Sequence, residues 1–146
     1  MKGLLSLILP GLIFCCSSAQ AMCWHQAAEK YRIEPALLKA IAQVESGMKT
    51  NAVNINANGS YDIGLMQINS IHLPELKKKG ISEEALLSDA CLSVMTGASI
   101  LQHMINKYGY TWEAVGAYNA GTSAKRRLLR FRYAYKVWQA YEENMR

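Results

Sequence analysis

The stretch Ile41–Ser70, IAQVESGMKTNAVNINANGSYDIGLMQINS, decides how this chain of 146 residues folds. It begins in a helical pattern that ends at Gly47, because glycine readily adopts the left-handed conformation that closes a helix. A polar loop rich in Asn and Gly follows, the one place where the pattern favours strands. We therefore expect a small irregular or β-containing segment around residues 49–64, and one or two helical turns between Leu65 and Ser70.

Helical patterns surround this segment on both sides. The helix that starts at Pro35 carries apolar residues at i, i+4, i+7 and i+11, which predicts a buried stripe of Leu37, Ile41, Val44 and Met48. Further helices are expected at residues 23–32, 74–79, 89–108, 111–120 and 123–142, with a short one beginning at Ser82. The last of these helices carries Leu128, Phe131, Tyr135 and Trp138. The predicted fold class is mainly α, in a single domain.

The first residues have the features of a secretory signal peptide. Lys2 supplies a positive start, Leu4–Cys16 is almost continuously apolar, and Ala19-Gln20-Ala21 matches a cleavage pattern. We expect residues 1–21 to be removed after Ala21, leaving a periplasmic or secreted domain at residues 22–146. A retained membrane anchor is the alternative; no other segment is long and apolar enough to span a bilayer, so stable membrane insertion is not expected.

Two cysteines, Cys23 and Cys91, lie in the predicted mature chain. In an exported protein such a pair predicts a disulfide, and two independent buried thiols are the alternative. The histidines are scattered, without the spacing of zinc ligands, at His25, His72 and His103. We therefore predict neither a metal site nor a cofactor.

Glu45 combines two features that raise the pKa of a carboxyl group. Leu38, Ile41 and Ala42 share its helix face, so the carboxylate is expected to lose part of its hydration. It also lies near the negative end of the helix dipole. A raised pKa suits a general acid, although an exposed surface glutamate is the alternative. Asp62, in the loop, is either a second carboxylate of the kind that glycosidases pair or a turn residue.

Three motifs occur in order along the chain: Glu45-Ser46-Gly47, Gly64-Leu65-Met66-Gln67 and Ala117-Tyr118-Asn119-Ala120-Gly121. Together they resemble the motifs of the soluble lytic transglycosylase catalytic domain, and the resemblance extends from about Trp24 to Trp138. It implies a lysozyme-like α domain that acts on peptidoglycan strands. A compact domain with its own signal peptide is most similar to the specialised subgroup that serves type III or type IV secretion or pilus systems.

The resemblance also implies a reaction. The bond cut would be the MurNAc–GlcNAc β-1,4 bond, with Glu45 as sole acid/base and a 1,6-anhydroMurNAc product. Ser46 would hydrogen-bond near the reacting sugar, and Met66 would form part of the cleft wall. Gln67 and Asn119 would contact N-acetyl or hydroxyl groups, while Tyr118 would hold the glutamate or the sugar ring.

Asp62 leaves the reaction type open. The stretch from Tyr61 to Asn69 also resembles animal lysozymes, in which the aspartate is the second catalytic carboxylate. Asp62 would then stabilise an oxocarbenium ion or favour hydrolysis, and Asn69 would be a sugar contact or a turn residue. A muramidase that hydrolyses the bond is one alternative, and a non-catalytic wall-binding module is another.

The formal net charge of +5 favours an anionic partner without choosing among cell wall, lipid and nucleic acid. The basic residues cluster near the C-terminus, at Lys125, Arg126, Arg127, Arg130 and Arg132. We interpret this cluster as a solvated helix face near anionic stem peptides, and expect no nucleic-acid partner.

Overall fold

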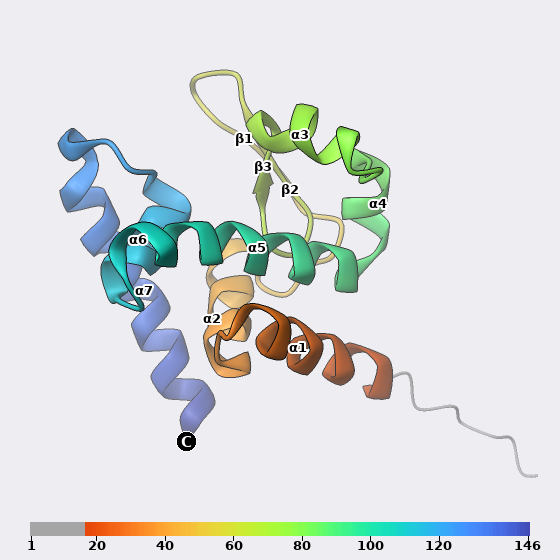
Figure 1. Ribbon diagram of the computed structural model, residues 1–146, viewed down its shortest axis with the longest axis horizontal. Coiled ribbons are helices and arrows are strands. Elements are labelled where there is room, and N and C mark those ends of the chain that lie inside the picture. The colour runs from red at the N-terminus through yellow and green to blue at the C-terminus, as the bar shows by residue number, and fades with distance from the viewer. Residues whose placement is uncertain (1–16) are drawn as a thin grey trace, which may run out of the picture.

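Seven α-helices and a small three-stranded sheet, which lies at one end of the molecule, make up the part of the chain that the computed structural model describes, residues 17–146 (Figure 1). The predicted mainly α fold class is confirmed. The helices are α1 (Ser17–Tyr31), α2 (Pro35–Ser46), α3 (Leu73–Lys78), α4 (Glu83–Ser88), α5 (Ala90–Tyr108), α6 (Trp112–Ala120) and α7 (Arg127–Met145). Two 3-10 turns, η1 (Ser70–His72) and η2 (Ala124–Arg126), lead into α3 and α7.

Helix α2 ends where its sequence predicts. Gly47 adopts the left-handed conformation, with φ of 59°, and closes the helix directly after Ser46. Leu38 and Ile41 are fully buried and fix the inner face of the helix. The prediction for Met48 was wrong: this residue lies beyond the cap, with φ of 67°, and is 40% exposed. The helical period does not extend past the glycine, so the buried stripe stops before Met48.

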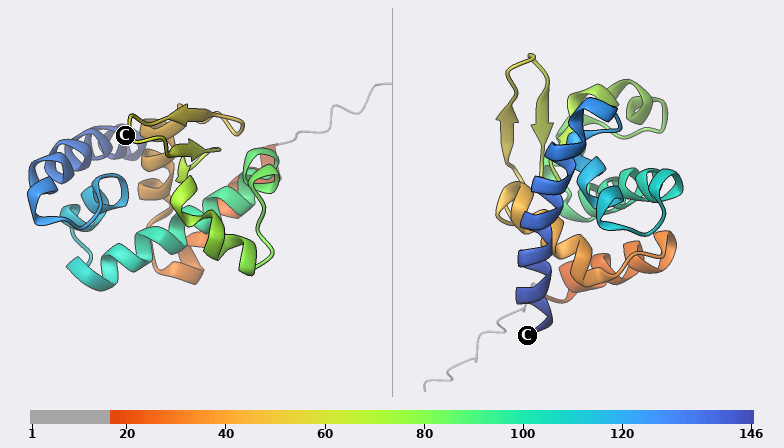
Figure 2. Two further views of the ribbon diagram at one scale, coloured as in Figure 1. Left: turned by 90° about the horizontal axis from the view of Figure 1, so that it is seen from above. Right: turned by 90° about the vertical axis from the view of Figure 1, so that its left-hand side faces the viewer.

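The predicted β-containing segment is an antiparallel sheet of β1 (Val53–Ile55), β2 (Tyr61–Ile63) and β3 (Ile68–Asn69), with β2 in the centre. Figure 2 shows the hairpin of β1 and β2 projecting past the end of α2. The helical turns expected between Leu65 and Ser70 were partly wrong, because a tight turn leads into β3 instead, and the 3-10 turn begins only at Ser70. Positive φ values at Gly64 and Gln67, 75° and 50°, reverse the chain there.

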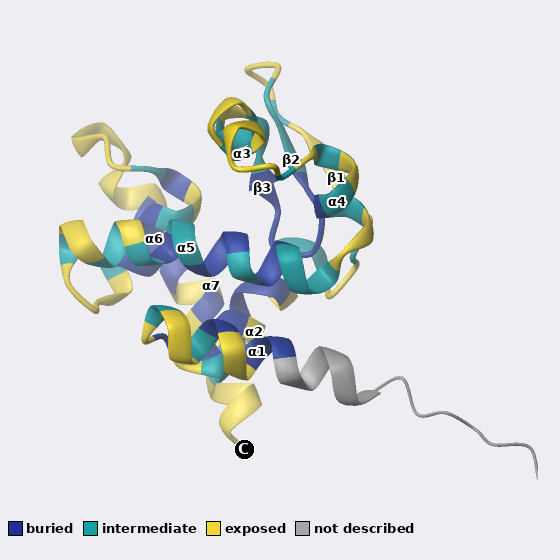
Figure 3. Ribbon diagram, turned by 45° about the vertical axis from the view of Figure 1, so that its right-hand side comes forward, coloured by how far each residue is buried: buried dark blue, intermediate teal, exposed yellow. Residues whose placement is uncertain are grey.

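Helix α5 crosses the middle of the molecule, and buried residues lie along it and along the inner faces of its neighbours (Figure 3). Helices α6 and α7 pack especially closely. A Cβ atom at Gly116 would overlap the backbone carbonyl of Arg130, so only glycine permits this approach. Helix α7 turns Tyr133, Ala134 and Val137 inward. The aromatic and aliphatic residues on its other side are exposed, namely Leu128, Phe131, Tyr135 and Trp138.

The assignment of Arg130 to a solvated basic face was wrong. This side chain is only 4% exposed and forms an ion pair with Glu113 at 2.9 Å. Its Nη1 atom also donates to the carbonyl oxygens of Gly121 and Ser123. A buried guanidinium is tolerated when its donors are satisfied in this way, and here it joins α6 to α7.

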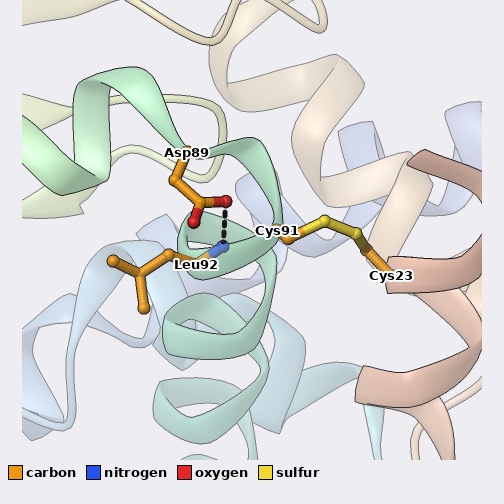
Figure 4. Close-up of a disulfide and its surroundings, with 4 residues drawn as sticks. All are labelled: Cys23, Asp89, Cys91 and Leu92. Carbon is orange, nitrogen blue, oxygen red and sulfur yellow. Dashed lines mark hydrogen bonds between the residues drawn. A yellow bond between two sulfur atoms is a disulfide. The ribbon is translucent and has the colours of Figure 1, made fainter. Parts of the chain in front are cut away.

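The predicted disulfide between Cys23 and Cys91 is present, with 5.3 Å between the Cα atoms (Figure 4). It ties α1 to the start of α5, beside the Asp89 side chain, which accepts a hydrogen bond from the backbone N–H of Leu92 and caps that helix. The bond therefore fixes the N-terminal helix to the centre of the fold.

The predicted signal peptide lies mostly outside the described residues, so its removal after Ala21 stays a prediction. None of the helices within residues 17–146 has the length and apolar character needed to cross a membrane.

Candidate active site

A cleft of about 550 Å³ lies between the sheet and α6, and both carboxylates singled out in the sequence line it. Glu45 comes from the end of α2, and Asp62 comes from the central strand β2. The side chains that complete the cleft are mostly polar, and they include Asn56, Asn58, Ser60, Gln67, Asn69, Tyr118, Asn119 and Arg126. The fold thus brings together residues from α2, the sheet and α6 that are far apart in the sequence.

Glu45 has the raised pKa that its sequence position predicts. Burial raises the pKa of this carboxyl group from its ordinary value of 4.5 to about 7, and the negative charge of Asp62 adds to the rise. Interactions with the side chains of Tyr133 and Asn119 partly oppose it. Near neutral pH the carboxyl group can therefore both give up and take back a proton, as an acid/base catalyst must.

The partner of Glu45 is a residue that the sequence analysis missed. The hydroxyl of Tyr133, on α7, donates a hydrogen bond of 2.5 Å to Oε1 of Glu45. Burial and the neighbouring carboxylate raise the pKa of Tyr133 well above its usual value, so the hydroxyl keeps its proton. It can hold the carboxyl group in one orientation without competing for the proton that would be transferred. No sequence pattern singles out this tyrosine, because α7 carries aromatic residues on two faces.

Asp62 is oriented by two amides. Nδ2 of Asn69, its direct neighbour on β3, donates to Oδ1 at 2.7 Å, and Nδ2 of Asn56 donates to Oδ2 at 3.0 Å. The backbone N–H of Ile71 donates to Oδ1 of Asn69, which also caps the following 3-10 turn. Both interpretations of Asn69 are therefore compatible with its position, since it supports a turn and faces the cleft. Asn56 was not singled out in the sequence.

Tyr118 and Asn119 both line the cleft from α6. The hydroxyl of Tyr118 donates to the backbone carbonyl of Met66 at 2.7 Å, so it anchors α6 to the loop. The hydrogen bond to the glutamate comes from Tyr133 instead. Tyr118 is half-buried at the cleft, while Asn119 is exposed beside Glu45.

Three other motif residues hold the loop in place. Met66 is fully buried against Gly97, so the expectation that it forms a cleft wall was wrong. The hydroxyl of Ser46 donates to the Leu65 carbonyl at 2.7 Å and joins the end of α2 to the loop. The Gln67 amide accepts from Asn54 and donates to the Ala52 and Gly64 carbonyls, so its polar atoms are engaged within the protein.

The described residues hold no group of three or more His, Cys, Asp or Glu side chains placed to bind a metal ion. The cleft itself presents a half-buried carboxyl group of raised pKa, an oriented second carboxylate and several amides.

Comparison with known families identifies the domain. The profile described as "Transglycosylase SLT domain" matches residues 22–140, which include the whole cleft. The chain belongs to the transglycosylase SLT domain family.

Two relatives match this SLT domain over most of their own length. Invasion protein IagB of Salmonella typhimurium (strain SL1344) is 58% identical over 127 residues, which cover 87% of this chain and 79% of that protein. Protein IpgF of Shigella flexneri is 51% identical over 122 residues, covering 84% of this chain and 80% of that protein.

The solved structure of an inactive mutant of the lytic transglycosylase Slt from Pseudomonas aeruginosa matches the fold of this SLT domain. The TM-score is 0.68 at 19% sequence identity, over 88% of this chain and 24% of that one. The chain thus spans about a quarter of the length of Slt. The likeness confirms the predicted lysozyme-like α fold.

Proposed function

We propose that this protein is a lytic transglycosylase that cleaves the MurNAc–GlcNAc β-1,4 bond of peptidoglycan and leaves a 1,6-anhydroMurNAc end. The observation that carries the proposal is the burial of Glu45 in a polar cleft, which raises the pKa of its carboxyl group to about 7. Membership of the SLT domain family supports a peptidoglycan substrate.

In the proposed reaction, protonated Glu45 gives its proton to the glycosidic oxygen, and the GlcNAc side leaves with the bonding electron pair. The N-acetyl oxygen of MurNAc stabilises the positive charge at C1. The Glu45 carboxylate then removes the proton from the MurNAc 6-hydroxyl, whose oxygen bonds to C1. Glu45 ends protonated, as it began, so one residue serves both steps. Tyr133 keeps the carboxyl group in place throughout.

A second candidate is a muramidase that uses Asp62. The observation in its favour is the orientation of the Asp62 carboxylate by Asn56 and Asn69 on the wall of the cleft that also holds Glu45. In this alternative, Asp62 stabilises the oxocarbenium ion, and water attacks C1 in place of the 6-hydroxyl. A non-catalytic wall-binding module is the third candidate.

Digestion of purified sacculi separates the three candidates. Products of wild type, Glu45→Gln and Asp62→Asn should be identified by mass, because anhydro and reducing ends differ by one water. We expect anhydro ends from the wild type and none from Glu45→Gln. Reducing ends throughout would establish the muramidase. Full activity of Glu45→Gln would overturn the mechanism, and an inactive wild type with an unchanged biological effect of Glu45→Gln would favour the wall-binding module.

We further propose that the protein acts in the periplasm or outside the cell and opens the wall locally for a type III or type IV secretion or pilus apparatus. The disulfide supports an oxidising compartment, and the relative named as an invasion protein supports the link to secretion. The mature protein from a periplasmic extract should begin at Met22. Recovery of the uncleaved chain in the cytoplasm would contradict this proposal.

A further inference from the structure

The cleft continues past Glu45 into a recess of about 350 Å³. Glu45, Asn119 and Arg126 line both spaces, whereas Asp62 lines only the cleft. The recess therefore adjoins the cleft at Glu45 and does not reach Asp62. Its remaining walls come mainly from α7, at Leu129, Arg132, Tyr133 and Lys136.

Three of the residues that line the recess are cationic: Arg126, Arg132 and Lys136. Arg126 ends the 3-10 turn η2, and Arg132 and Lys136 lie one helical turn apart on the same face of α7. None of the three forms an ion pair with another described residue, in contrast to Arg130, whose charge is balanced by Glu113. Glu45 is the one acid on the walls of the recess.

This arrangement is unfavourable for the protein alone. Like charges at i and i+4 on a helix destabilise it, and Arg126 adds a third positive charge to the same space. Three cations that converge on a concave surface with a single acid among them, and without an ion pair, are typical of a site for an anionic ligand. The planar guanidinium groups favour carboxylate or phosphate oxygens, which they bind with two parallel hydrogen bonds. Leu129 gives the recess an aliphatic contact as well.

We propose that this recess binds the free carboxylates of a stem peptide carried by the peptidoglycan strand, and so makes the enzyme prefer strands that bear peptides. The inference rests on the proposed function. The sugar backbone offers few charges for three cations, whereas the stem peptide attached to MurNAc carries carboxylates and aliphatic groups. Because Glu45 belongs to both spaces, a peptide in the recess lies next to the bond in the cleft.

The first test compares two substrates and two matched variants. The substrates are glycan strands with intact stem peptides and the same strands stripped of peptide by an amidase. The recess variant is Arg132→Gln with Lys136→Gln. The control is Lys77→Gln with Lys79→Gln, which removes the same charge from exposed positions at the end of α3.

We expect the wild type to cleave peptide-bearing strands with a kcat/KM on the order of tenfold higher, since a tenfold change corresponds to one modest charged contact. The recess variant should lose this preference mainly through KM, and the control should keep it. Added salt should reduce the preference of the wild type, because it screens exposed charges. Equal cleavage of both substrates by the wild type would overturn the inference and leave the proposed function intact. Cleavage of neither would overturn both.

The second test measures binding directly with the tripeptide alanyl-γ-glutamyl-diaminopimelate and its fully amidated form. Glu45→Gln should bind the tripeptide, and the amidated form should bind at least tenfold more weakly. Adding Arg132→Gln and Lys136→Gln to this variant should abolish the difference in affinity between the two peptides. Equal binding of both peptides would overturn the proposal, because the recess would then not recognise the carboxylates of the stem peptide. That result would favour an acidic segment of a partner protein as the ligand.

Discussion

Nδ2 of Asn69 donates a 2.7 Å hydrogen bond to Oδ1 of Asp62 across the antiparallel pair of β2 and β3. The two residues are directly opposed in the sheet, so the backbone register itself sets the position of the acid. A side chain used only for a turn would bond to its own backbone. Asp62 instead has an amide on each carboxylate oxygen and lines the cleft with Glu45.

Asp62→Asn should lower the pKa of Glu45, because the repulsion from Asp62 is one cause of its elevation. Activity that requires protonated Glu45 would then fall at a lower pH than in the wild type. The rate should also drop on the order of a hundredfold if Asp62 stabilises positive charge in the transition state. The measurement is kcat/KM on sacculi from pH 5 to 9. An unchanged alkaline limit would contradict the electrostatic coupling of the two acids.

Tyr133→Phe should have the opposite effect on the same pH profile. The Tyr133 hydroxyl lowers the pKa of Glu45, so its loss should move the alkaline limit to higher pH. The carboxyl group also loses its fixed orientation, and we expect kcat to fall on the order of tenfold or more. Tyr135→Phe, on the exposed side of α7, is the matched control and should leave both the alkaline limit and kcat unchanged. A loss of activity in Tyr133→Phe without the pH shift would indicate a packing defect instead.

Glu45→Gln should stabilise the folded protein at alkaline pH. The folded-state pKa of about 7 lies above the ordinary 4.5, so between these values the folded protein holds a proton that the unfolded chain has released. The wild type therefore loses stability as pH rises from about 4.5 to 7, by on the order of 3 kcal/mol in total. Urea unfolding should show the variant to be more stable than the wild type at pH 8 and nearly equal at pH 4. Equal stability of the variant and the wild type at pH 8 would mean that ionised Glu45 does not destabilise the folded protein.

Cys23→Ser with Cys91→Ser should reduce the free energy of unfolding by about 4 kcal/mol on the loop-entropy estimate, because the bond closes a long loop, of sequence separation 68. The measurement is urea unfolding of both proteins under oxidising conditions. Dithiothreitol should destabilise the wild type and leave the variant unaffected. If dithiothreitol destabilised both proteins equally, its effect could not come from reduction of this disulfide.

Local patterns predicted the helices and the β-containing segment, because these depend on neighbours within a few residues. They also predicted that Glu45 loses part of its hydration, although the side chains around it include the distant Tyr133 and Asn119. Tyr133 escaped prediction because α7 has aromatic residues on two faces, and the stripe of Phe131, Tyr135 and Trp138 is as apolar as the inner one. Arg130 was misplaced for a related reason, since the glutamate that balances its charge lies on another helix.

The motif residues show a different limit of prediction. The resemblance implied that Met66 forms a cleft wall and that Gln67 contacts the sugar, yet Met66 packs on α5. Gln67 lines the cleft, while its amide bonds to Asn54 and to loop carbonyls. A motif records which residues a site requires without separating those that touch the substrate from those that shape the loop. Hydrogen-bond partners across the loop make that distinction, and they depend on the folded backbone.

The contact between Glu45 and Tyr133 joins the second helix to the last, across 88 residues of sequence. During synthesis, which runs from the N-terminus, the acid is made well before its tyrosine. Until α7 has emerged and docked on α2, Glu45 lacks the group that orients it. The orientation of the acid is therefore complete only once the last helix has formed and packed against the second.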